Sequence, residues 1–140
     1  MTVSKIEQLQ FGISREWHQG EDIKYCILRT PEVIDRAGLE YWKLVIGASV
    51  KLFKRDEPVR ILYDLSLRGQ VIPHYIGTLY QALAGRGGYQ AFVLPDELVH
   101  RVLIAIRQMR AERDDAIAGR IEERLFTAEA DGLHWLLNVN

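Results

Sequence analysis

Two short apolar runs constrain the fold of this 140-residue chain more than any other feature. Val59–Leu65 (VRILYDL) and Tyr89–Leu94 (YQAFVL) are nearly continuously apolar, which is typical of strands that are buried on both faces of a sheet. Predicted helices follow each run, at about Pro73–Ala84 and about Pro95–Arg113. Strands joined by helical crossovers pair in parallel. The two runs therefore predict an α/β arrangement.

The chain before these runs predicts a β-hairpin. Ile6–Ile13 and Ile23–Leu28 have the composition of strands, and Trp17–Asp22 lies between them. This intervening segment contains Gly20 and Asp22, and glycine and aspartate favour turns. The first two strands are therefore expected to pair antiparallel.

The remaining segments complete one domain. Thr30 is expected to cap a first helix that runs to about Phe53. A charged strand, Arg120–Phe126, is expected at a sheet edge, and a short last helix over Ala128–Leu137. The predicted order β-β-α-β-α-β-α-β-α gives a single α/β domain with a mixed, mostly parallel sheet and a leading hairpin.

Composition excludes several classes of protein. Apolar residues make up 48% of the chain and charged residues 26%, which indicates a globular rather than a disordered protein. The net charge of −1 gives no overall field that would attract nucleic acid or an anionic membrane. The single cysteine, Cys26, cannot form an internal disulfide, which favours a reducing compartment. We therefore expect a soluble cytoplasmic protein without nucleic-acid or membrane partners.

Three features together resemble a known superfamily. They are the predicted element order, the strand sequence VRILYDLS, and the closing sequence RLFTAEADGLHWLL. They resemble the STAS domain superfamily, and more closely its stand-alone SpoIIAA-like branch, over roughly Ile23–Leu137. The resemblance implies helices packed largely on one face of the sheet. It also implies a role in binding partners or small ligands.

Anti-sigma-factor antagonists of this superfamily carry a phosphorylatable serine in an Asp-Ser-Ser-Gly motif, at the start of the helix after the central strand. The corresponding stretch here, Leu67–Tyr75, contains no serine or threonine. Ser66 belongs to the end of the strand and matches the small polar residue after the family's Asp-Leu pair. The phosphorylation switch is therefore not expected in this chain.

Polar residues follow the central strand at the position where open α/β sheets usually bind ligands. Asp64 and Ser66 lie at its carboxyl end, and Arg68 and His74 come next. These four residues are candidates for a polar ligand-binding pocket. Alternatively, Asp64 or Ser66 caps the turn by accepting from backbone N–H groups. A third reading is an enzyme that uses Asp64, Ser66 and His74, which requires the three groups to converge in a pocket.

Other chemistry has little support in the sequence. The four histidines and the single cysteine do not have metal-ligand spacing, so neither a metal nor another cofactor is expected. Gly85–Gly88 closes a predicted helix and opens a strand, whereas a phosphate loop has the opposite order. This glycine run is therefore interpreted as a helix end and turn.

The first helix has two apolar stripes, and a helix that is apolar on two sides needs two neighbours. The stripe expected to pack on the sheet consists of Val33, Ala37, Tyr41, Leu44, Ala48 and Leu52. The second stripe consists of Leu39, Trp42, Ile46, Val50 and Phe53. Either another part of this chain covers the second stripe, or a second copy does. We expect the latter, a homodimer through the first helix.

The sequence therefore predicts a non-enzymatic, STAS-like interaction or regulatory domain that forms a homodimer. The alternative is a module that binds a small apolar or lipid-like ligand in a cavity between the first helices and the sheet.

Overall fold

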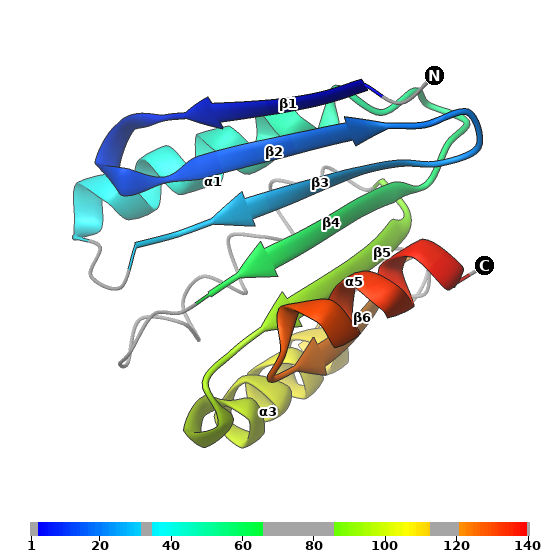
Figure 1. The fold of residues 1–140 in the computed structure, drawn as a ribbon. Helices are drawn as coiled ribbons and strands as arrows, with labels where there is room; N and C mark the ends of the chain where they lie inside the picture. The colour runs from blue at the N-terminus through cyan, green and yellow to red at the C-terminus, as the bar shows by residue number, and fades with distance from the viewer. Residues whose placement is uncertain (1–2, 32–34, 66–85, 113–120, 140) are drawn as a thin grey trace.

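The computed structural model describes residues 3–31, 35–65, 86–112 and 121–139, which form one sheet with helices on both faces (Figure 1). The six strands of the sheet lie in sequence order. They are β1 (Val3–Gln8), β2 (Ser14–Gln19), β3 (Lys24–Arg29), β4 (Val59–Asp64), β5 (Gly88–Val93) and β6 (Ile121–Phe126). The helices are α1 (Arg36–Val50), α3 (Asp96–Glu112) and α5 (Glu129–Asn138), with a 3-10 turn, η1 (Gln10–Gly12), after β1.

The sheet is mixed, as the sequence predicts. Strands β1, β2 and β3 pair antiparallel, and β3, β4, β5 and β6 pair in parallel. The predicted two-stranded start is wrong, because three strands precede α1. Within the predicted first strand, Phe11 and Gly12 adopt positive φ angles of 59° and 74°, and this reversal separates β1 from β2. The turn between β2 and β3 begins later than predicted, because Trp17–Gln19 belongs to β2.

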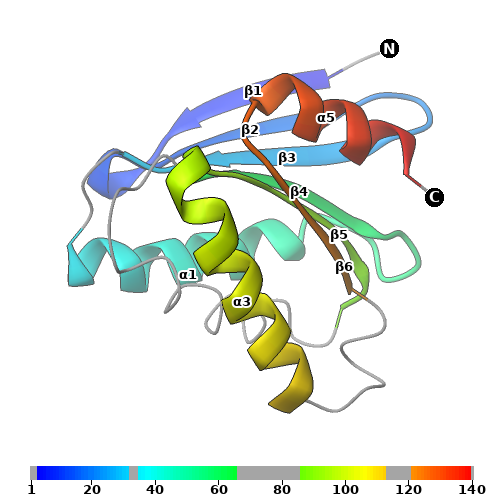
Figure 2. The same cartoon turned by 90° about the horizontal axis from the view of Figure 1, so that it is seen from below.

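Helices cover the two faces of the sheet unequally. Helices α1 and α3 lie on one face and α5 lies on the other (Figure 2). The larger core lies under α1 and α3, with Tyr63 and Phe92 of the central strands stacked at 5.1 Å. The smaller core joins α5 to the opposite face through Leu62, Ala91 and Leu136. The expectation that the helices pack largely on one face is met by α1 and α3, and α5 is the exception. The predicted helix Pro73–Ala84 lies outside the described residues.

Helix α1 packs on the sheet with the stripe that we expected to face a second copy. Trp42 and Ile46 are fully buried, Val50 and Phe53 are nearly so, and Leu39 packs against the same core. The Trp42 ring lies 5.9 Å from the ring of Tyr63 in β4. The prediction that this stripe needs a cover from outside the chain is therefore wrong. Its aromatic side chains bury more apolar area than the alanines of the other stripe do, and so it takes the inner position.

The other stripe faces outward. Leu44 is 69% exposed and Leu52 is 43% exposed. Ala37 and Ala48 are also exposed, and Tyr41 is partly so; Val33 lies outside the described residues. We call Ala37, Tyr41, Leu44, Ala48 and Leu52 the outer stripe of α1.

The start of α1 also differs from the prediction. Asp35 is the N-cap, and its side chain accepts a 2.8 Å hydrogen bond from the backbone N–H of Gly38. Thr30 does not cap the helix, because its hydroxyl donates to the main-chain oxygen of Asp64 at 3.0 Å. Thr30 therefore ties the end of β3 to the end of β4.

A matched pair of substitutions tests the orientation of α1. Ile46→Ala should lower the free energy of unfolding by about 2–5 kcal/mol, because it leaves a cavity in the core. Leu44→Ala, two residues away, should change it by only about 0.5 kcal/mol, because Leu44 is exposed. Denaturant unfolding of both variants measures the difference. Equal losses, or a larger loss for Leu44→Ala, would contradict the orientation.

Candidate functional site

Asp64, the first residue of the predicted pocket, lies at the carboxyl end of β4, opposite Arg29 at the end of β3. Because the two strands are parallel, their carboxyl ends lie side by side at one end of the sheet. Both side chains lie on the face that carries α5. The Arg29 Nη1 donates to Asp64 Oδ2 at 3.3 Å. An arginine that the sequence reading did not single out therefore holds the predicted site residue.

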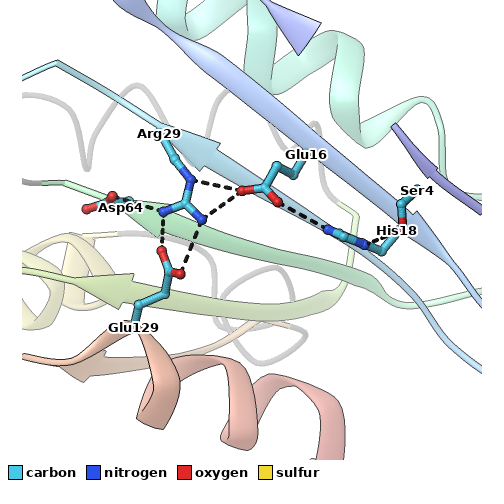
Figure 3. A network of polar contacts seen from close by, with 6 residues as sticks. All are labelled: Ser4, Glu16, His18, Arg29, Asp64 and Glu129. Atoms are coloured by element: carbon cyan, nitrogen blue, oxygen red, sulfur yellow. Dashed lines mark hydrogen bonds and ion pairs between the residues drawn. The ribbon is translucent and has the colours of Figure 1, made fainter. Parts of the chain in front are cut away.

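Two further carboxylates bind the same guanidinium (Figure 3). Glu16 of β2 accepts from Arg29 Nη2 at 2.7 Å and from Nε at 2.9 Å. Glu129, in the first turn of α5, accepts from Nη1 and from Nη2, the latter at 3.2 Å. One cation thus joins β2, β3, β4 and α5. We call this group of four residues the Arg29 cluster.

The electrostatics of the Arg29 cluster favour its charged form. The hydrogen bonds that Arg29 donates to Glu129 raise the pKa of Arg29 above its ordinary value, against the opposing effect of partial burial, and Glu16 raises it further. Partial burial raises the pKa of Glu16, but the hydrogen bonds and charge of Arg29 lower it more, so that the net shift is downward. The negative charge of Glu129 is also stabilised by the dipole at the N-terminus of α5. The cluster therefore acts as an ionic clamp between the sheet and α5.

The polar contacts continue to the edge of the sheet. His18 Nε2 lies 3.4 Å from Glu16 Oε1, and His18 Nδ1 lies 2.9 Å from Ser4 Oγ. The His18 ring stacks on Tyr25 at 4.7 Å. The residue types match a hydrolase triad, but triad chemistry also needs donors beside the serine that stabilise an oxyanion. Ser4 instead lies within strand β1, directly opposite His18 of β2. The contacts are therefore interpreted as cross-strand pairs that stabilise the sheet.

The structure describes only part of the site that the sequence predicts. Asp64 belongs to the Arg29 cluster, whereas Ser66, Arg68 and His74 lie outside the described residues. Sequence reasoning missed the other members of the cluster because they come from distant segments. Two signals pointed to them: Arg29 ends a largely apolar strand, and Glu129 opens the last helix.

Within the described ranges, histidine, cysteine and carboxylate side chains form no group of three or more arranged to hold a metal ion. No helix of the described part of the chain has the length and apolar character needed to cross a membrane.

A second feature is the surface around the outer stripe of α1. Phe11 of η1 is 44% exposed, and its ring lies 5.6 Å from the ring of Tyr41. An open groove of about 620 Å³ runs beside the helix, with Leu44, Gly47 and Ala48 among its lining residues. It is also lined by four cations: Lys43, Lys51, Arg55 and Arg86. Apolar side chains and positive charge thus share one side of α1.

The Arg29 cluster predicts a pH-dependent contribution to stability. Because the pKa of Glu16 is lowered on folding, its contribution is complete above the unfolded value of about 4.3 and is lost as pH falls through the folded value. Glu16→Gln should therefore cost about 1–3 kcal/mol at pH 7 and clearly less at pH 3. The exposed Glu122→Gln is the control, with little effect at either pH. Denaturant unfolding at both pH values measures this, and an equal cost at both would contradict the clamp.

Comparisons of the chain with protein-family models, with curated proteins and with solved structures find no match. The resemblance to the STAS superfamily therefore stays a prediction that depends on element order and two short motifs.

Proposed function

We propose that this protein is a non-enzymatic interaction domain that binds a partner protein through the outer stripe of α1. The observation that carries the proposal is the exposure of Leu44 on α1 and of Leu52 just after its end, while the opposite face of this helix is packed in the core. Contiguous large apolar side chains in water usually mark a contact surface. The STAS resemblance implies a binding role as well.

The state of the nucleophiles supports a non-enzymatic role. Burial raises the pKa of Cys26 to about 12, and the side chain has no exposed area. The thiol therefore stays protonated near neutral pH and out of reach of substrates. The Asp64 carboxylate accepts a hydrogen bond from Arg29, so this side chain is held in an ion pair.

Packing supports a protein partner over a small apolar ligand. Such a ligand would need a cavity between α1 and the sheet. In the described part of this interface, fully buried Trp42, Ile46 and Tyr63 fill the space, with the Trp42 and Tyr63 rings in contact. The apolar area of α1 that remains accessible lies on the outer side of the helix, where a flat protein surface can cover it.

Site-specific photo-cross-linking in cells tests the proposal. A benzophenone side chain in place of Leu44 should give a discrete cross-linked product, because a partner covers this position. The same group in place of His100, which is exposed on α3, should give none. Adding Leu52→Glu should abolish the Leu44 product, since both residues belong to one contact. No product from Leu44, or equal products from both positions, would overturn the proposed surface.

A further inference from the structure

We infer that the partner is a second copy of this chain, whose own α1 packs antiparallel on the outer stripe, so that Leu44 of each copy enters the groove beside Gly47 and Ala48 of the other. This inference rests on the proposed function and names the occupant of the same surface. It replaces the dimer through the second stripe, which the sequence predicted and which packs in the core of the same copy.

The spacing of the outer stripe suits a second helix. Ala37, Tyr41, Leu44 and Ala48 are separated by four, three and four residues, which is the repeat of a coiled-coil seam. Two helices that pack in this way come within about 8–10 Å of each other, and small residues near the crossing allow that approach. Gly47 and Ala48 are two such small residues, and they lie in the C-terminal half of α1.

The groove offers space that no described side chain of the same copy fills. Among the described residues, no heavy atom lies within 4 Å of a Cβ atom built on Gly47. Glycine inside a helix costs about 1 kcal/mol relative to alanine. The described contacts within one copy do not require a glycine at this position. Leu44, only three residues earlier, is a large exposed apolar side chain. One surface thus presents both a projection and a recess.

The positions of the projection and the recess match a two-fold axis. With the axis at the level of residue 46, Leu44 lies opposite Ala48 of the second copy. The same contact then occurs twice, as an interface between identical copies requires. A different protein partner has no reason to need both features on one helix.

The charged residues beside the outer stripe also fit a two-fold axis. Glu40 and Lys51 are both exposed, and eleven residues is close to three helical turns, so they flank the stripe on the same side. An antiparallel second copy places its Glu40 beside Lys51, and its Lys51 beside Glu40. The groove carries four cations, so an incoming carboxylate is favoured there. A parallel arrangement would instead place this flank of the two copies on opposite sides of the seam, so that Glu40 and Lys51 would not pair across it.

Filling the recess is the sharpest test. Gly47→Gln should raise the melting temperature of the isolated chain by about 3 °C, because glutamine is a better helix former. It should also weaken self-association by at least about tenfold, because the side chain occupies the recess and removes a central contact. Sedimentation equilibrium between about 1 and 100 µM measures the association. Because the variant folds more stably, lost association cannot be ascribed to unfolding. Unchanged association of Gly47→Gln would overturn the inference.

A charge exchange tests the antiparallel register. Glu40→Lys and Lys51→Glu should each weaken the dimer about three- to fivefold, because each places like charges opposite each other. The double variant should return to within about twofold of the wild-type dissociation constant, because the pair is restored with its signs exchanged. Additive losses in the double variant would overturn the register.

Two outcomes separate this inference from the proposed function. A wild-type chain that is monomeric at about 100 µM overturns the second copy as occupant. If the Leu44 cross-link then contains a different protein, the outer stripe remains a contact surface and only the inference fails. If a monomeric chain instead co-sediments with anionic vesicles, and Leu44→Glu abolishes this, the inference and the protein partner both fail.

Discussion

Strands β4 and β5 have apolar side chains on both faces, and the arrangement of the rest of the chain follows from covering them. Ile61, Tyr63 and Phe92 point toward α1 and α3, while Leu62 and Ala91 point toward α5. Removing these faces from water contributes the largest favourable free energy in the fold, so helices must lie on both sides. The last helix covers β4, β5 and β6 (Figure 2), and on the same face of the sheet polar side chains of β1, β2 and β3 pair with one another.

Much of this arrangement could be read from the sequence. The runs VRILYDL and YQAFVL predicted β4 and β5, because residues that are apolar on both faces of a strand have few other places to lie. The boundary between β1 and β2 could not be predicted, since it depends on Phe11 adopting a positive φ that this residue type rarely takes. Periodicity showed that α1 has two apolar faces but not which one packs inward. Comparing side-chain size, with Trp42 and Phe53 on one stripe and two alanines on the other, would have identified the inner face.

The candidate site was less predictable than the fold. Asp64 was found because the carboxyl end of a central strand is a position with a general meaning in α/β sheets. Its partners were not, since Glu16, Arg29 and Glu129 come from three segments whose proximity depends on strand order and on the face that α5 covers. Long-range ion pairs of this kind leave no local pattern in the sequence.

Arginines hold α5 at both of its ends. Arg29 binds Glu129 in its first turn, and Arg60 donates to the main-chain oxygens of Leu136 and Val139 at 2.7 and 3.0 Å. These contacts join residues between 76 and 100 positions apart, so the loops that they close span more than half of the chain. The last helix is therefore suited to dock late in folding, and its amide protons should exchange with solvent through openings that leave the rest of the sheet intact.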